Sequence, residues 1–453
     1  MNTIQNSTIF KYARTLYPKG IDYNSISDKE NFKFSQPVYN ASFHFEDLNT
    51  DIDLIIPREG NTLEIIEFKP TVNHKLENFF EMGFHIYILQ KLGFTVEKAN
   101  LVLINPKYKF KGEINPEEYF NIKDVLSRAV GLQGEIENKI LELREVLSKE
   151  NLPERISNRS CLKPNDCKYT NLCWNDLGES DIFKLREGGK LSNSLFNDGI
   201  RFLKDIPPEI ELSNSQKIQI TCELENNVFI NYESITNFLK DIKKPYYFID
   251  FETVNPAFPL YNDSLPYQHI PFLFYLFIQR EDEELKEVYY IEQEGDDPRK
   301  RVLEILKDII KSEGTIFCYN DLIEKKCIRE SAEIYTEYKD WSDSIMPLFK
   351  DLSIPFKNFY YYNPLQNGSA TLKSILPALT GVDYSDLNIK DGNTANSEFL
   401  NWKFRPEIVK DKENLFKELI EYCRMDSLAL VKILEKLELF KKEDDFLIEG
   451  NSV

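Results

Sequence analysis

Two acidic residues, Asp250 and Glu252, stand two positions apart inside the aromatic segment 246–253 (YYFIDFET). The apolar run predicts a buried β-strand, and residues i and i+2 of a strand point to the same side of the sheet. Two carboxylates would therefore lie side by side in a hydrophobic environment, which costs free energy unless a cation neutralises them. Since hard divalent cations prefer oxygen ligands, the pair predicts a Mg²⁺ or Mn²⁺ site.

A second group of residues supplies the other side chains that a two-metal centre would need. Glu324 comes about one helical turn after the predicted strand 315–319, and α/β proteins usually build their sites at strand ends. Tyr422 and Asp426 are four residues apart on a predicted helix, so their side chains share one face. Two cations held about 4 Å apart activate water and stabilise the leaving oxygen in phosphodiester hydrolysis.

The residue types suggest a division of roles within this centre. Asp250 would bridge both cations, while Glu252 and Asp426 would each hold one side. Glu324 would act through a water molecule or from outside the ligand set, and Tyr422 would orient the attacking water. A single D-x-E pattern is common on solvated strands, so the prediction depends on the ordered set of motifs.

The ordered set resembles a known family. Residues 244–441 look like a DnaQ-like exonuclease domain of the DEDD class, which has an RNase H-like fold. Residues 250–252 match the first motif of that class, and residues 320–324 resemble the second, with Glu in place of the usual Asp. Tyr422 and Asp426 match the tyrosine form of the third motif. The resemblance implies 3′–5′ exonuclease activity by a two-metal mechanism.

Three residues nearer the N-terminus form a second candidate centre. Asp53 lies in the apolar segment 51–56, and Glu67 and Lys69 follow on the next predicted strand, where they share one face. In a nuclease the two carboxylates would hold a cation, and the lysine would position water or offset transition-state charge. The plainer interpretation is an amphipathic hairpin with a salt bridge, and the bare pattern favours it.

A wider resemblance supports the nuclease interpretation of this segment. Residues 8–175 resemble the RecB-like PD-(D/E)xK nuclease domain, of restriction-endonuclease-like fold, which is fused ahead of a DnaQ-like domain in an uncharacterised prokaryotic family. Segments 13–20 and 105–108 carry part of the likeness. RecB-like enzymes usually have a Gln on the helix after the Glu-x-Lys strand, and His85 takes that place here. His85 would donate a hydrogen bond to a phosphate. The alternative is that it is simply a histidine packed in the core.

Three cysteines, Cys161, Cys167 and Cys173, are clustered in one short segment. With seven cysteines in the chain a disulfide framework is not expected, so the cluster indicates metal binding. The resemblance to RecB-like nucleases of the iron–sulfur subtype implies a [4Fe-4S] cluster, but the early fourth cysteine of that subtype is missing. The open alternatives are a non-cysteine fourth ligand, a leader segment absent from this chain, three reduced thiols, and zinc.

Two lysines are further candidates for substrate contact. Lys107 begins the run 107–111 (KYKFK), whose alternating cations and aromatic rings suit single-stranded nucleic acid. The same run also suits an exposed edge strand that lysines protect from aggregation. Lys373 opens a predicted helix near the exonuclease motifs, where it would contact a substrate phosphate or remain a solvated lysine.

The composition of the whole chain limits the function classes. The 453 residues carry a net charge of −19, which argues against a broad, non-specific grip on DNA. The N-terminus has no signal-peptide pattern, and the longest apolar run, 270–278, is too short to span a bilayer. We therefore predict a cytoplasmic protein with no membrane partner. The sequence contains no Walker loop, G-x-S-x-G elbow or dinucleotide fingerprint.

The hydrophobic pattern predicts an α/β protein in several parts. We expect a nuclease domain over 1–178, a connecting region over 179–242, an exonuclease domain over 243–441 and an acidic, loose tail over 442–453. The expected strands are 38–45, 52–56, 63–68, 101–104, 246–252, 270–279, 287–292 and 315–319, and the expected helices include 75–92, 116–129, 133–149, 371–379 and 413–441.

These patterns together predict a metal-dependent nuclease with two centres, acting on DNA or RNA with single-stranded DNA favoured. A role in DNA repair or defence follows from the resemblance alone. The alternative is a non-catalytic scaffold that binds nucleic acid through both nuclease folds. The departures at Glu324 and His85 and the missing cysteine keep this alternative open. The sequence does not indicate an oligomeric state.

Overall fold

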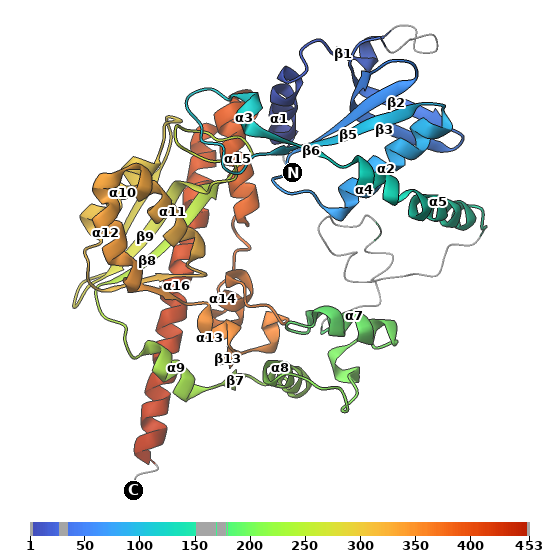
Figure 1. Cartoon of the computed structure of the whole chain (residues 1–453). Helices are drawn as coiled ribbons and strands as arrows, with labels where there is room; N and C mark the ends of the chain where they lie inside the picture. The colour runs from blue at the N-terminus through green and yellow to red at the C-terminus, as the bar shows by residue number, and fades with distance from the viewer. Residues whose placement is uncertain (1–2, 27–34, 151–168, 170–177, 179, 451–453) are drawn as a thin grey trace. The chain divides into compact units, whose positions relative to one another are not determined.

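The computed structural model describes residues 3–26, 35–150, 169, 178 and 180–450 (Figure 1). The chain forms two compact units, which are residues 1–154 with 255–268, and residues 155–254 with 269–453. This division differs from the predicted boundaries, because segment 255–268 interrupts the predicted exonuclease domain and packs with the first unit.

The first unit is built on a six-stranded mixed sheet in the order β1-β2-β3-β4-β5-β6. Strands β2, β3 and β4 are antiparallel neighbours, β5 is parallel to β4, and β6 is antiparallel to β5. The predicted strands of this region are confirmed, with somewhat longer bounds. The strands are β1 Ile21–Asp22, β2 Val38–Phe45, β3 Leu48–Pro57, β4 Thr62–Lys69, β5 Thr95–Ile104 and β6 Phe120–Asp124.

The helices of the first unit include one correction to the sequence prediction. They are α1 Thr3–Thr15, α2 Leu76–Lys91, α3 Pro116–Tyr119, α4 Leu126–Gly131 and α5 Gln133–Leu147. The single helix predicted over 116–129 is wrong, because β6 separates α3 from α4. Pairing with β6 satisfies the backbone groups along the outer edge of β5, and this tertiary gain outweighs local helix propensity.

Segment 255–268 completes the core of the first unit. Ala257 is 1% exposed and packs in the same cluster as Tyr119. The Tyr119 hydroxyl donates to the Ala257 carbonyl at 2.9 Å, and the Phe110 amide donates to the Ser264 carbonyl at 3.1 Å. The first unit is therefore discontinuous in sequence.

The second unit contains a five-stranded mixed sheet in the order β10-β9-β8-β11-β12, with β8 at its centre. Strand β8 is antiparallel to β9 and parallel to β11, and β11 is parallel to β12. A small antiparallel pair, β7 with β13, lies elsewhere in the unit. The strands are β7 Phe229–Ile230, β8 Tyr246–Val254, β9 Ile270–Gln279, β10 Lys286–Ile291, β11 Thr315–Cys318, β12 Phe349–Asp351 and β13 Tyr361–Tyr362.

Helices cover both faces of this sheet (Figure 1). Tyr247, Ile249 and Phe251 of β8 pack in one core cluster with residues of α10 and α11, while α16 contacts β8 and β9. Alternate residues of β8 therefore face different layers. The helices are α7 Gly189–Asn197, α8 Asn214–Glu225, α9 Tyr232–Leu239, α10 Arg299–Ile309, α11 Leu322–Ile334, α12 Lys339–Ile345, α13 Ile354–Lys357, α14 Leu372–Thr380, α15 Gly392–Phe404 and α16 Lys412–Gly450.

The last helix is longer than the sequence prediction. The loose tail expected from residue 442 onward is wrong as far as Gly450, because α16 continues to that residue. The segment contains neither Gly nor Pro before Gly450, and Lys and Glu are good helix formers, so the backbone continues the helix.

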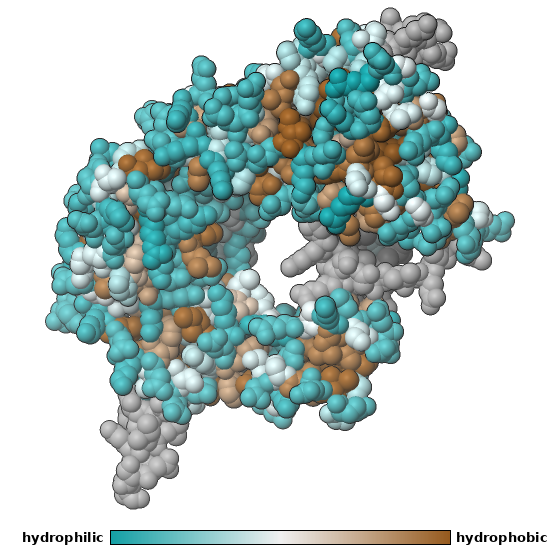
Figure 2. Space-filling model, in the orientation of Figure 1, coloured by the Kyte–Doolittle hydropathy of each residue, from teal (hydrophilic) through white to brown (hydrophobic). Residues whose placement is uncertain are grey.

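The surface carries both hydrophilic and hydrophobic residues, although most apolar residues are buried in the cores. Hydrophilic residues cover most of the visible face, with separate hydrophobic patches among them (Figure 2). Within the described part of the chain, none of the helices combines the length and the apolar character that crossing a bilayer requires.

Candidate metal centre

Three carboxylates from distant parts of the chain converge in the second unit. Asp250 and Glu252 project from β8 and Asp426 projects from α16, and one oxygen of each lies within 4.8 Å of the others. Glu252 and Asp426 are 5% and 7% exposed, and Asp250 is partly exposed. The acidic pair predicted on the strand and the acid predicted on the helix thus form one cluster.

The electrostatics of this cluster favour a bound cation. Burial, and then the negative charges of Asp426, Glu252 and Glu324, raise the pKa of Asp250 well above its usual value. Burial and the charge of Asp426 likewise raise the pKa of Glu252. These shifts mean that the charged forms are destabilised by desolvation and by each other, and a divalent cation would remove most of that cost.

Glu324 stands beside the three converging carboxylates. It lies in the first turn of α11, after a tight turn in which Asn320 has a φ of 65°, a conformation that Asn tolerates. Burial raises the pKa of Glu324 to about 8, and its buried Oε2 has no hydrogen-bond partner among the described residues. Its charge still raises the pKa of Asp250. This position is compatible with the outer role predicted for Glu324.

A hydrogen-bonded relay connects the carboxylates to a lysine. Lys373, in the first turn of α14, donates from Nζ to the Tyr422 hydroxyl at 3.0 Å, and Tyr422 is hydrogen-bonded to Asp426. The predicted i and i+4 pair on α16 therefore shares one face. Burial raises the pKa of Asp426, whereas a hydrogen bond from Tyr384, the Lys373 charge and the hydrogen bond from Tyr422 oppose the rise.

The structure adds residues that the sequence did not indicate. Tyr384 donates a hydrogen bond to Asp426 Oδ1, and Cys423 Sγ lies 3.4 Å from the Asp250 carbonyl oxygen. Gly392, at the start of α15, also borders the site, since a Cβ there would be in ordinary contact with Glu252 Oε2 at 3.7 Å. A single tyrosine, cysteine or glycine gives no signal in the sequence, because each of these residues reaches the site only through tertiary packing.

The second predicted centre is also assembled, in the first unit. Glu67 on β4 accepts a hydrogen bond from the Asp53 amide at 3.1 Å, and Asp53 accepts one from the Phe68 amide at 2.8 Å. Lys69 Nζ lies 2.9 Å from Glu67 Oε2. Burial and the Glu67 charge raise the pKa of Asp53 to about 8. The predicted hairpin arrangement and its salt bridge are both present.

Helix α2 adds two further groups to this centre. Glu81 Oε2 lies 2.7 Å from Lys69 Nζ, and His85 Nε2 lies 3.3 Å from Glu67 Oε1. Ligand atoms of Glu67, Glu81 and His85 all lie within 4.8 Å of one another, so the structure groups Glu67 with two α2 residues. Although burial opposes it, the contacts with His85 and Lys69 lower the pKa of Glu67 to about 2. The sequence analysis did not predict Glu81 as a member of this group.

His85 itself is a packed residue. It is 3% exposed, and its Nδ1 lies 2.5 Å from Thr50 Oγ1. Its contacts with Thr50 and Glu67 leave it inside the unit. This burial is compatible with a packed histidine, and a contact between His85 and a phosphate stays a prediction.

The remaining candidates have different outcomes. Lys107 is exposed, but its neighbour Tyr108 is only 5% exposed and its hydroxyl donates to the Glu113 carbonyl, so that ring is not available for stacking. Residues 107–110 are not a strand, so the edge-strand interpretation is wrong, while substrate contact by Lys107 stays a prediction. Cys161, Cys167 and Cys173 lie outside the described residues, and their metal binding stays a prediction.

Two comparisons found similar proteins, and both of the matches are uncharacterised. A domain of unknown function, DUF2779, matches residues 247–371, which include Asp250, Glu252 and Glu324 but not the motif on α16. An uncharacterized protein of Mycoplasma genitalium, MG366, is 24% identical over 410 residues, or 80% of this chain. The chain spans 60% of the length of that relative.

These two matches support an uncharacterised prokaryotic family. Neither the domain family nor the Mycoplasma protein is described with an activity, a substrate or a cofactor. No solved structure matches the chain significantly.

Proposed function

We propose that the second unit hydrolyses phosphodiester bonds of nucleic acid with Mg²⁺ or Mn²⁺ held by Asp250, Glu252 and Asp426. The observation that carries the proposal is the convergence of these three carboxylates within 4.8 Å, at a largely buried position. An all-oxygen donor set suits a hard divalent cation. Bound there, the metal would supply charge stabilisation and a more acidic water.

The balance of charge favours this centre over the one in the first unit. In the second unit four carboxylates interact with one another, and Lys373 is the cation whose charge opposes them. In the first unit Lys69 lies between Glu67 and Glu81, and His85 contacts Glu67. The first centre sets three carboxylates, those of Asp53, Glu67 and Glu81, against Lys69, whereas the second sets four against Lys373 and has the greater need of an external cation.

The protein's own side chains have definite parts in the proposed reaction. Tyr422 and Tyr384 fix the orientation of the Asp426 carboxylate by hydrogen bonds. Lys373, placed beside Tyr422, offers its ammonium group to a substrate phosphate. Glu324, with a free oxygen and a raised pKa, accepts or donates a proton at the edge of the site.

The finer assignment extends the resemblance described above. We infer a DnaQ-like, RNase H-like exonuclease that works from the 3′ end, together with a RecB-like first unit that is a second nuclease centre or a nucleic-acid-binding remnant of one. The mixed sheet with the D-x-E motif on its central strand supports this inference. Single-stranded DNA is the favoured substrate, in DNA repair or defence.

The proposal is tested by offering purified full-length protein single-stranded DNA and RNA, labelled at either the 5′ or the 3′ end. With Mn²⁺ present, we expect a ladder of shortened 5′-labelled products and early release of mononucleotide from the 3′ label. EDTA should stop the reaction. Binding of both polymers without any cleavage would overturn the proposed enzymatic activity and support the alternative of a non-catalytic scaffold.

Replacing Lys373 with Met should separate substrate binding from metal binding. We expect KM for the oligonucleotide to rise roughly tenfold or more, since a hydrogen bond to a charged group is worth about 1.5–3 kcal/mol. Mn²⁺ affinity should stay equal or increase, because a positive charge leaves the cluster. Steady-state kinetics and calorimetric Mn²⁺ titration give the two values.

The matched control for this prediction is Lys432→Met on the same unit. Lys432 is exposed and pairs with Glu435 one helical turn away. The control should leave both KM and Mn²⁺ affinity unchanged. An unchanged KM for Lys373→Met would show that this lysine does not contact the substrate.

A further inference from the structure

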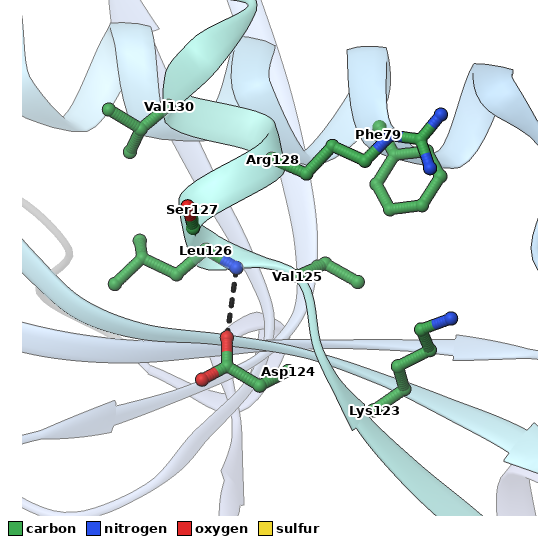
Figure 3. Close-up of a pocket in the computed structure, with 8 residues that line it drawn as sticks. All are labelled: Phe79, Lys123, Asp124, Val125, Leu126, Ser127, Arg128 and Val130. Atoms are coloured by element: carbon green, nitrogen blue, oxygen red, sulfur yellow. Dashed lines mark hydrogen bonds between the residues drawn. The ribbon is translucent and has the colours of Figure 1, made fainter.

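A pocket on the first unit gathers positive groups without acidic partners. It has a volume of about 790 Å³ and is lined by residues of β6 and α4 and by Phe79 of α2 (Figure 3). The Arg128 guanidinium lies 4.0 Å from the centre of the Phe79 ring. Lys123 Nζ lies 3.1 Å from His74 Nδ1, and the His74 ring packs edge-on against Phe79 at 5.0 Å. Two cationic side chains, one of them hydrogen-bonded to an imidazole, thus line the pocket.

None of the acidic residues that the structure describes forms an ion pair with Lys123 or Arg128. The nearest acid in sequence, Asp124, accepts a hydrogen bond from the Leu126 amide at 2.9 Å (Figure 3). Desolvation, and then the charges of Lys123 and Arg128, lower the pKa of His74. The lowered pKa favours the neutral imidazole, so Lys123 and Arg128 are the two cations of this cluster.

Such a cluster is unusual on this chain. The sequence has 75 acidic residues against 56 Lys and Arg, so an average surface would repel a polyanion. A polyanion is best held where cations gather that no ion pair neutralises. Lys123 and Arg128 meet this condition, although Asp124 also lines the pocket.

The position of the cluster relates it to the Glu67 and Lys69 centre. Glu67 of β4 pairs with Leu101 of β5, and Leu101 pairs with Lys123 of β6. Residues paired in register across neighbouring strands point to the same face of a sheet, and two strand spacings amount to about 10 Å. The cations therefore lie on the same face of the sheet as the predicted nuclease residues, two strands away.

We propose that Lys123 and Arg128, with His74 beside them, form a site for the phosphodiester backbone of a single-stranded nucleic acid. Phe79 is buried and supports the Arg128 guanidinium from below. The groups suit a polymer better than a small phosphate. Lys123 and Arg128 are exposed, and the apolar side chain of Val130, which is 43% exposed, also lines the pocket. Exposed cations contact a passing backbone, and apolar neighbours contact sugars and bases.

The test measures binding without hydrolysis, so its result does not depend on the proposed function. Full-length protein in EDTA is titrated into a fluorescein-labelled oligothymidylate at several salt concentrations. The double variant Lys123→Ala, Arg128→Ala should bind roughly tenfold or more weakly, and the slope of log K against log salt should shrink by about 1.4, or about 0.7 for each lost phosphate contact. Affinity and slope equal to those of the parent would overturn the proposal.

The matched control removes the same charge elsewhere on the unit. The double variant Lys98→Ala, Lys139→Ala also loses two exposed cations, neither of which lines the pocket. It should bind like the parent. A loss equal to that of the pocket variant would show a general charge effect and would also overturn the site.

A second readout separates a polymer from a small phosphate ligand. The chain has four histidines, so the imidazole resonances can be assigned by single substitutions. Oligothymidylate should shift the His74 resonances and leave those of exposed His44 unchanged. Thymidine monophosphate and inorganic phosphate should do so only at much higher concentrations. Equal responses to all three would overturn the assignment to a polymer.

Discussion

Replacing Asp250 with Asn should abolish hydrolysis and, in metal-free protein, raise the unfolding temperature. Activity should fall by more than the roughly 100-fold that loss of an outer hydrogen-bond partner costs in metal sites, because Asp250 itself would be a ligand. Stability should rise because burial and three neighbouring carboxylates destabilise the charged Asp250 side chain. Asn keeps its shape and removes its charge.

Two measurements check this pair of opposite effects. Digestion with Mn²⁺ reports activity, and thermal unfolding in EDTA and then in Mn²⁺ reports stability. The parent should gain stability on adding Mn²⁺, whereas Asp250→Asn should gain little. Asp343→Asn, an exposed change on α12 that breaks only a pair with Lys339, should alter neither activity nor metal response. Full activity of Asp250→Asn would exclude the proposed centre.

Replacing Lys69 with Met should destabilise the first unit by about 3–5 kcal/mol, as expected when one partner of a buried ion pair is removed. Glu67 is only 3% exposed and would lose the ammonium group 2.9 Å from its Oε2. Glu81 would lose the same partner, but it is more exposed and contributes less. Chemical denaturation of the full chain, followed by a probe in the first unit, measures the loss.

The double variant Lys69→Met, Glu67→Gln tests the cause of that effect. It removes the unpaired charge as well as the lysine, so most of the lost stability should return. Lys98→Met, an exposed change on β5, is the control for loss of a lysine on the same sheet. If Lys69→Met is as stable as the parent, Lys69 does not neutralise Glu67, and the charge argument that favours the second unit's centre is lost.

The features that sequence analysis predicted correctly depend on local geometry. Asp250 and Glu252 share a strand face because strands repeat every two residues, and Tyr422 and Asp426 share a helix face because helices repeat every 3.6. The apolar runs that form β8 and β9 are long and almost wholly buried, so their type was clear.

The features that were missed depend on packing between distant segments. Tyr384 reaches Asp426 from 42 positions away, and Glu81 reaches Lys69 from a different element. Strand β6 has four exposed residues out of five, so it has no buried stripe that would mark it as a strand. Its pairing with β5 comes from the tertiary structure rather than from its own residues.

The discontinuous first unit has a consequence for how the protein is synthesised. Residues 1–154 leave the ribosome first, but the core position filled by Ala257 stays empty until residues 155–254 have also been made. Closing such a distant contact carries a greater entropic cost than a local one. A nascent chain stopped before residue 255 would therefore carry an incomplete, partly exposed core, and it is at this stage that a chaperone would have most to bind.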